Sequence, residues 1–276
     1  MKSVDIAVCH QALLSIAVEF DRICRKHGIP YYMIGGTMLG AVRHEGFIPW
    51  DDDMDFAVPR VWFDRLPSLL SGELPPHLRV RLLNEPDLHT SNYLKVDDVR
   101  TRIAYKGLER IKDMGINIDI FPLDDGLKTS CGTRLFTRYI QLFLRLNDLL
   151  SIDPAIRRGV KKGMARWIRF LFPIPAGRLL SYVEKCIRKH VAPASGYYVV
   201  FYGIWGMKEI VDKKYFGRPR EYPFDRFRFF GVADADAYLT QLYGNYMELP
   251  PVEKRTNHAN GQYAVDASLF DAQSEA

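Results

Sequence analysis

The sequence predicts an α+β fold in which a mixed sheet is flanked by helices and carries a basic helical insertion. Residues 4–27 have the apolar spacing of an amphipathic helix. Short apolar or alternating segments at 31–34, 56–58 and 115–123 are typical of strands. Residues 131–192 mix arginines, leucines and aromatic residues at helical spacing. A chain of 276 residues is long enough for one large domain or for a core with an appended helical region.

Composition and cysteine spacing limit the class of protein. No run of about 18 apolar residues occurs, so we predict no membrane-spanning helix. The N-terminal sequence MKSVDIAVCHQALL lacks the apolar core and cleavage site of a signal peptide. Cys9, Cys24, Cys131 and Cys186 do not have the spacing of a zinc or redox motif. We therefore expect free thiols and a cytoplasmic location.

Positive charge is concentrated in one segment. The net charge of the chain is +5, but residues 134–190 hold 13 Lys and Arg against three acids, which gives +10. The rest of the chain has 25 basic and 30 acidic residues, which gives −5. Two interpretations of the basic segment stay open. Its apolar faces could pack on the core, or Trp167, Phe170 and Phe172 could enter an anionic membrane surface, on the inner face of the cytoplasmic membrane. Its leucine and aromatic content does not favour nucleic acid as a partner.

The first predicted element is the helix over residues 4–27. Its apolar positions follow a period of 3.6 residues: Val8, Leu13, Ala17, Phe20 and Cys24. Lys26, His27 and Gly28 form the cationic and glycine-containing end that helices favour. Pro30 then leads into a short strand at 31–34.

Two glycines follow this strand. Gly35 and Gly36 predict a tight turn that a ligand can approach closely, and Thr37 to Val42 predicts a short helix after the turn. The free N–H groups at the start of such a helix favour an anion such as a phosphate. Gly35, Gly36 and Thr37 are therefore candidate ligands of a diphosphate.

The sequence WDDDMDFAV then places acids at alternating positions. In a strand, Asp53 and Asp55 would point to one face while Met54 and Phe56 are buried on the other. Two carboxylates on one face repel each other unless a cation lies between them, and rigid oxygen ligands suit Mg²⁺ or Mn²⁺. A run of Asp can also form a solvated loop, but the apolar neighbours oppose that interpretation.

A calcium loop is excluded on sequence grounds. Such a loop starting at Asp51 needs Gly at its sixth position and Glu at its twelfth. These positions are Phe56 and Trp62. The acidic run therefore predicts a different kind of metal site.

Further elements follow along the chain. We predict a helix over 60–75 and strands over 78–83 and 93–96. Gly115 to Leu123 reads GINIDIFPL, in which Ile116, Ile118 and Ile120 share one face and Asp119 lies on the other. Pro122 is expected to end this strand, with a turn at 124–126.

The last third of the chain gives three predictions. Residues 197–204 predict a strand, and residues 236–243 predict a helix capped by Gly244. Pro250 and Pro251 impose an extended path. Residues after Asn260 are small and polar, and we predict them to be disordered.

These motifs together resemble the LicD family, which includes the fukutin-related proteins. The resemblance rests on three phrases: the Gly-Gly turn with WDDDMDFAV, the phrase IDIFPLD, and YGNYMELPPVEKRTNH near the C-terminus. It covers residues 5–125 and 225–258. Where the family has Glu before a glycine of the C-terminal block, this chain has Phe230 before Gly231, which puts any role of that position in doubt.

The resemblance implies a nucleotidyltransferase-like fold, related to the DNA polymerase β superfamily. It implies that Asp119 is a third carboxylate beside Asp53 and Asp55, as a metal ligand or as the base toward the acceptor. Lys95 and Arg43 are the implied phosphate ligands, although an exposed edge lysine is the alternative for Lys95. Two further candidates, Arg255 and His258, reach the donor or only close the fold.

The family also implies a reaction. LicD-like enzymes move phosphocholine from CDP-choline to a sugar hydroxyl of a surface glycan, such as lipopolysaccharide or teichoic acid, or of its lipid-linked precursor, and release CMP. Relatives use CDP-ribitol. Two other functions stay open: a D-x-D metal-dependent glycosyltransferase, and a non-catalytic regulatory protein. The implied organisation is a catalytic core over 1–130, a basic helical insertion over 131–195, a block over 196–260 that completes the site, and a disordered tail over 261–276.

Overall fold

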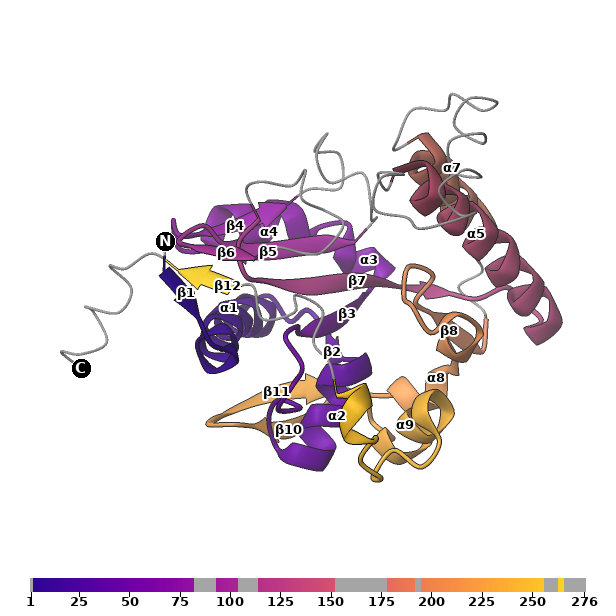
Figure 1. Ribbon diagram of the computed structural model, residues 1–276. Helices are drawn as coiled ribbons and strands as arrows, with labels where there is room; N and C mark the ends of the chain where they lie inside the picture. Colours follow the sequence, from indigo (N-terminus) through magenta and orange to yellow (C-terminus); the bar gives the residue numbers. More distant parts are fainter. Residues whose placement is uncertain are drawn as a thin grey trace, which may run out of the picture.

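A nine-stranded mixed sheet organises the protein, as the computed structural model shows in Figure 1. The structure describes residues 2–81, 93–103, 114–151, 178–191, 195–255 and 263–265. The main path of the sheet is β10-β11-β2-β3-β7-β5-β4, and β8 and β9 extend β7 at its far end. A separate sheet of three strands has the order β1-β12-β6. The expectation of an α+β protein with a mixed sheet and flanking helices is confirmed.

The strands and helices have the following bounds. The strands are β1 (Lys2–Val4), β2 (Tyr32–Met33), β3 (Asp55–Pro59), β4 (Leu78–Arg81), β5 (Leu94–Asp98), β6 (Thr101–Ile103), β7 (Asn117–Asp125), β8 (Tyr197–Val199), β9 (Ile210–Asp212), β10 (Arg220–Phe224), β11 (Phe227–Gly231) and β12 (Tyr263–Val265). The α-helices are α1 (Ile6–Lys26), α2 (Gly35–His44), α3 (Arg60–Phe63), α4 (Leu66–Glu73), α5 (Ser130–Ser151), α7 (Arg178–His190), α8 (Lys213–Phe216) and α9 (Ala235–Tyr243). Two 3₁₀ helices are η3 (Gly206–Glu209) and η4 (Val252–Lys254).

Helix α1 forms as its sequence predicts. The Asp5 side chain accepts a hydrogen bond from Val8 N–H and caps the first turn, while Arg25 and Lys26 lie in the last turn. Its apolar face is buried at Leu13, Ala17 and Phe20. Phe20 packs edge-on against Tyr31 at 5.0 Å between ring centroids, which joins the helix to the start of β2.

Strands β3 and β7 are parallel neighbours at the centre of the sheet. Phe56 of β3, Ile118 and Ile120 of β7, and Met54 just before β3 are fully buried, as the alternating pattern predicts. The expectation that Pro122 ends the strand is wrong, because β7 continues to Asp125. β5 pairs with β7 only as far as Ile120 and β8 only from Asp124, so Pro122 lies between these two ladders and its missing N–H is tolerated.

Several other predicted elements have different bounds. The single helix expected over 60–75 is two helices, α3 and α4, and Pro67 lies at the start of the second. The glycine turn belongs to α2, which begins at Gly35 rather than at Thr37. The strand expected over 197–204 ends at Val199. Residues 82–83 of the strand expected over 78–83 lie outside the described residues.

The C-terminal third returns to the main sheet. The hairpin of β10 and β11 was not predicted, and it places Gly231 of β11 beside Met33 of β2 in a parallel pair. Helix α9 begins and ends as expected, with Asp234 as its N-cap and Gly244 at its C-terminus. Tyr263–Val265 form β12 between β1 and β6, so the predicted disorder after Asn260 does not hold for these three residues.

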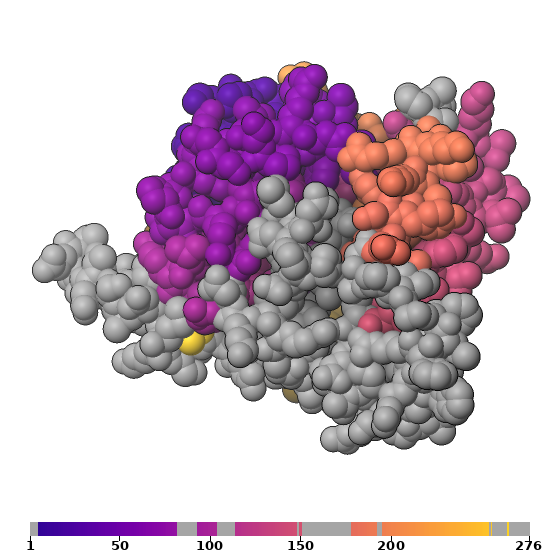
Figure 2. Space-filling model, turned by 90° about the horizontal axis from the view of Figure 1, so that it is seen from above, coloured from indigo at the N-terminus to yellow at the C-terminus, as the bar shows by residue number. Residues whose placement is uncertain are grey.

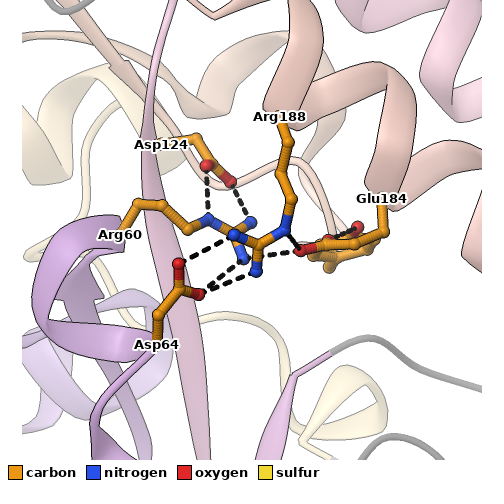
Figure 3. A network of polar contacts seen from close by, with 6 residues as sticks. Arg60, Asp64, Asp124, Glu184 and Arg188 are labelled. Carbon is orange, nitrogen blue, oxygen red and sulfur yellow. Dashed lines mark hydrogen bonds and ion pairs between the residues drawn. The ribbon is translucent and has the colours of Figure 1, made fainter.

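Helices α5 and α7 pack side by side at one end of the sheet (Figure 1), and Figure 2 shows α7 between α5 and the first part of the chain. Ion pairs hold α7 in place (Figure 3). Arg60 forms two hydrogen bonds of 2.7 Å with Asp124 and one of 2.9 Å with Glu184 of α7. Arg188 of α7 forms two bonds of 2.7 Å with Asp64. Part of the basic segment is therefore fixed to the core by charge.

Two further observations bear on the class of protein. Among the described residues, no helix is both long and apolar enough to cross a membrane. All four cysteines are free, as expected, with Cys9 and Cys24 buried. Burial raises the pKa of both buried thiols well above the usual range, so they are not reactive nucleophiles.

Candidate active site

A pocket of about 890 Å³ lies where α2 and the acidic stretch meet β5, β7 and the C-terminal segments. Residues from one side of it are those that the sequence singles out: Gly35, Gly36, Arg43, Asp53, Asp55, Lys95 and Asp119. Residues from the other side come from the last third of the chain: Tyr202, Gly203, Trp205, Glu209, Tyr238 and Tyr243. Of the remaining candidates, Thr37 and Arg255 do not line the pocket, and His258 lies outside the described residues.

Asp55 and Asp119 are partners in the parallel register of β3 and β7. The backbone fixes their relationship, because Asp119 N–H donates to the Met54 carbonyl at 2.9 Å. Burial raises the pKa of Asp55 well above its usual range, and the nearby charges of Asp53, Asp119 and Asp51 raise it further. The acids therefore crowd one another at a single place in the pocket.

Asp51 is an additional acid that the sequence reasoning missed. It lines the same pocket, and the signal was available, since Asp51, Asp53 and Asp55 occupy alternating positions. Its carboxylate lies over the start of α2: a Cβ added at Gly36 would be 2.7 Å from Asp51 Oδ2. Asp52 differs from its neighbours, because it is buried and does not line the pocket.

The glycines at the start of α2 make room for carboxylates. Gly35 has a φ of +54°, which favours glycine, and a Cβ there would be 3.5 Å from Asp55 Oδ2. Gly35 N–H donates to the Tyr238 hydroxyl oxygen at 3.1 Å, so this group is already used within the protein. The buried Thr37 hydroxyl accepts a 2.8 Å hydrogen bond from Asp55 N–H. Thr37 thus positions the backbone of Asp55 and does not face the pocket.

Lys95 is the cation closest to the acids in sheet register. It lies opposite Asp119 on β5, and its ammonium group forms a short ion pair with that carboxylate. It also donates to Asn117 Oδ1 at 3.1 Å and lies 5.0 Å from the centroid of the Tyr93 ring. The side chains of Lys95 and Asp119 are 11% and 15% exposed, so the pair is largely removed from solvent. The alternative of a freely exposed edge lysine is therefore wrong.

Two arginines lie in or beside the pocket that holds the acids. Arg43 lines the pocket and donates to the Tyr246 carbonyl at 2.8 Å. Burial lowers the pKa of Arg43, and the nearby charge of Arg255 adds to this effect. Arg255 donates to the Pro250 carbonyl at 2.9 Å and lies 5.1 Å from the Trp50 ring centroid. Arg255 therefore holds the C-terminal segment against Trp50, and both Trp50 and Pro250 line the pocket.

The carboxylates that line the pocket are candidate ligands of a divalent metal ion. Within the described parts of the chain, no three His, Cys, Asp or Glu side chains stand ready to hold an ion. The chemistry of the donors nevertheless fits Mg²⁺ or Mn²⁺, since four aspartates line one pocket and the charges of the other three raise the pKa of Asp55. A cation among them would offset the repulsion that burial intensifies.

Comparisons with known proteins show which families this chain is similar to. Residues 28–137 match the family model described as LicD/FKTN/FKRP, nucleotidyltransferase domain. The chain is 28% identical over 267 residues to the lipopolysaccharide cholinephosphotransferase LicD of Haemophilus influenzae, covering 94% of this chain and 97% of that protein. It is 38% identical over 50 residues to the ribitol 5-phosphate transferase FKRP of Homo sapiens, which is 18% of this chain and 10% of that protein.

Proposed function

We propose that this chain is a LicD-family transferase that forms phosphodiesters and has a nucleotidyltransferase-like fold; the match of residues 28–137 to the family model and the similarity to the Haemophilus influenzae relative support this. The reaction transfers phosphocholine from CDP-choline to a sugar hydroxyl of a surface glycan or its lipid-linked precursor. The Haemophilus influenzae relative, a lipopolysaccharide cholinephosphotransferase that aligns over nearly its whole length, supports phosphocholine as the transferred group and a glycan as the acceptor class. The pairing of Asp55 with Asp119 in one pocket is the observation that carries the proposal.

Asp53, Asp55 and Asp119 would hold a divalent ion, Mg²⁺ or Mn²⁺. Such an ion supplies charge neutralisation at the phosphate oxygens of the donor. Lys95 and Arg43 line the same pocket and bind phosphate oxygens that carry developing charge. The N-terminus of α2 adds the N–H groups near Gly36 to this anion site.

In the proposed step, the phosphocholine group passes from CMP to the acceptor hydroxyl. The acceptor hydroxyl oxygen forms a bond to the phosphorus that carries choline. The bond from that phosphorus to the oxygen bridging to CMP breaks, and CMP leaves with the electron pair. The hydroxyl proton passes to the Asp119 carboxylate, which Lys95 releases when its ammonium group moves to the donor phosphate.

A panel of CDP-alcohols tests the proposal. Purified protein is incubated with CDP-choline, CDP-ribitol and CDP-glycerol, with Mg²⁺, Mn²⁺ or EDTA, and CMP release is measured. We expect metal-dependent release with CDP-choline and a loss of about 10²–10³-fold in the double variant Asp53→Asn, Asp55→Asn. Asp212→Asn is the matched control, since Asn caps the exposed start of α8 as well as Asp does. Turnover retained in the double variant contradicts the proposal.

A CDP-ribitol donor is the second candidate, and the local similarity to FKRP favours it. The panel distinguishes the two donors by their relative rates. Calorimetric titration with UDP-sugars addresses the remaining alternative, a D-x-D glycosyltransferase. Binding of a UDP-sugar without binding of any CDP-alcohol would favour that alternative, and the absence of both would favour a non-catalytic protein.

The domain organisation is also a proposal. The core over 1–130 supplies the acids, and the block over 196–260 completes the site. The support is that β10 and β11 join the main sheet and that α9 contributes Tyr238 and Tyr243 to the pocket. The segment over 131–195 forms a basic insertion, and the tail proposed over 261–276 does not include β12 (Tyr263–Val265).

We further propose that the basic segment contacts an anionic membrane surface, which places the enzyme on the inner face of the cytoplasmic membrane near a lipid-linked acceptor. Trp167, Phe170 and Phe172, which the sequence analysis considers for this contact, lie outside the described residues. Within the described part of the segment, Leu135, Tyr139 and Leu142 form a stripe at helical spacing on α5, and the two leucines are 68% and 64% exposed. Arg138 and Arg145 are exposed beside it. Flotation with anionic liposomes tests this: we expect binding at low salt, and no binding would contradict it.

A further inference from the structure

We propose that Tyr202, Trp205, Glu209 and Tyr243 form a subsite for a quaternary ammonium group, so that they select phosphocholine over a neutral phospho-polyol. This inference rests on the transferase function proposed above. It assigns the part of the pocket that comes from the last third of the chain, next to the carboxylates. The contacts of each residue support it in turn.

Glu209 supplies negative charge. Its side chain lines the pocket although the residue is only 7% exposed. Its carboxylate accepts a 2.8 Å hydrogen bond from Trp205 N–H, and no described Lys or Arg forms an ion pair with it. Burying a carboxylate without a cation is unfavourable, and a cationic ligand would remove this cost. A neutral polyol would not remove the cost of burying the Glu209 carboxylate.

Gly203 shows how closely the loop surrounds this carboxylate. Gly203 also lines the pocket, and a Cβ added there would lie 1.9 Å from Glu209 Oε2. Only a residue without a side chain permits the loop to fold over Glu209 in this way. The carboxylate therefore has a fixed place in the pocket wall.

Aromatic rings supply the rest of the subsite. Trp205 and Tyr243 pack edge-to-face with 4.9 Å between ring centroids. The faces of such rings attract a quaternary ammonium group, which has no N–H to donate and is recognised by ring surfaces. The Lys208 ammonium lies 5.6 Å from the Trp205 ring but does not line the pocket, and it donates to the Leu242 carbonyl at 2.6 Å.

The tyrosine hydroxyls are used elsewhere. The Tyr202 hydroxyl donates a 2.6 Å hydrogen bond to Glu184. Glu184 belongs to the ion-pair network of Figure 3. Tyr238 accepts from Gly35 N–H. The pocket therefore meets ring carbons more than free hydroxyls at these two residues, which suits N-methyl groups. A ribitol chain would need several hydrogen-bond partners there.

Tyr243 joins this subsite to the carboxylates. Its hydroxyl oxygen lies 4.0 Å from the position of a Cβ added at Gly35, and Asp55 Oδ2 lies 3.5 Å from the same point. The ring of Tyr243 contacts Trp205. One side chain thus spans from the proposed phosphate site to the proposed ammonium site, as a short phospho-alcohol would.

Substrate discrimination tests the subsite. We compare kcat/KM for CDP-choline and CDP-ribitol in the wild type, Glu209→Gln and Trp205→Leu, with Glu45→Gln and Trp62→Leu as controls, because neither control residue lines the pocket. We expect each subsite variant to lower kcat/KM for CDP-choline by about tenfold or more, with CDP-ribitol changed by less than about twofold. Equal losses on both donors, or no loss, overturn the subsite. A wild-type preference for CDP-ribitol also overturns it and leaves the transferase proposal intact.

A binding measurement separates this inference from the transferase proposal. Tetramethylammonium and phosphocholine are titrated into the wild type and the same variants by calorimetry, which requires no turnover. Saturable binding that weakens in Glu209→Gln and Trp205→Leu supports the subsite even when no donor is turned over. Absence of saturable binding to the wild type overturns it.

Discussion

Lys95 and Asp119 face each other across the antiparallel pair of β5 and β7 and form an ion pair inside the pocket. The same carboxylate is the register partner of Asp55 on β3. Asp119 therefore has a cation on one neighbouring strand and an acid on the other. Such a position suits a group that changes partners when a charged ligand arrives.

Replacing Lys95 tests this exchange. We expect Lys95→Gln to lower kcat/KM for the donor by about 10²-fold, because the phosphate loses a cation and Asp119 loses its partner. Lys26→Gln is the control, since Lys26 pairs with Glu73 on the surface far from the pocket lining. Steady-state kinetics check the result, and activity equal in both variants would remove Lys95 from the mechanism.

A methyl group at Gly36 should disturb the acids without unfolding the protein. The new Cβ would lie 2.7 Å from Asp51 Oδ2, so the Asp51 carboxylate must move. We expect Gly36→Ala to lower kcat by about tenfold. Gly72→Ala is the matched control: no atom lies within 4 Å of its added Cβ, and alanine in α4 should stabilise the protein by up to about 1 kcal/mol. Kinetics and thermal unfolding measure the two effects.

The ion pairs that hold α7 should differ in their contributions to stability. Asp124 and Arg60 have side chains that are 1% and 15% exposed, whereas Asp64 and Arg188 are far more exposed. We expect Asp124→Ala to lower the free energy of unfolding by about 3 kcal/mol, because the largely buried Arg60 guanidinium loses two of its three hydrogen bonds to carboxylates and keeps only the one to Glu184. Asp64→Ala should lower it by less than about 1 kcal/mol. Urea denaturation measures both, and equal losses would contradict this ranking.

Glu209 predicts a pH dependence of stability. Burial raises the pKa of Glu209 from 4.5 to about 8. An acid with a raised pKa in the folded state stabilises the protein fully below its unfolded pKa, and this contribution is lost as pH rises from about 4.5 to about 8. Glu209→Gln cannot ionise, so its stability relative to the wild type should increase over that range, by roughly 4 kcal/mol. Thermal unfolding of both proteins at pH 5 and pH 8.5 in the absence of ligand measures this difference in stability. The same difference at both pH values would contradict the raised pKa of Glu209.

Local periodicity was enough to predict the elements that hold the acids. The 3.6-residue spacing of Leu13, Ala17 and Phe20 predicted α1, and the alternation around Asp55 and Asp119 predicted β3 and β7. Prediction failed where neighbouring strands decide the outcome. Pro122 continues β7 because the β5 and β8 ladders, which lie along one edge of β7, leave a gap at that residue, and no local pattern reveals a gap between two partner strands.

The far side of the pocket was not predictable from spacing. Glu209 lies in a short 3₁₀ helix and looks like an ordinary surface acid in the sequence. Its burial depends on Gly203, six residues earlier, and on Tyr238 and Tyr243 from α9. The hairpin of β10 and β11 was missed for a related reason: Pro223 and the charges at Arg220 and Glu221 oppose a central strand, and β10 is an edge.

The parallel contact between Gly231 and Met33 has a consequence for how the chain is made. Strand β2 leaves the ribosome early, but the neighbour that covers one of its edges is translated nearly 200 residues later. Throughout that interval the nascent polypeptide carries an open hydrogen-bonding edge, which can recruit other chains. A fragment limited to residues 28–137 would keep the same exposed edge permanently and should aggregate when it is expressed alone.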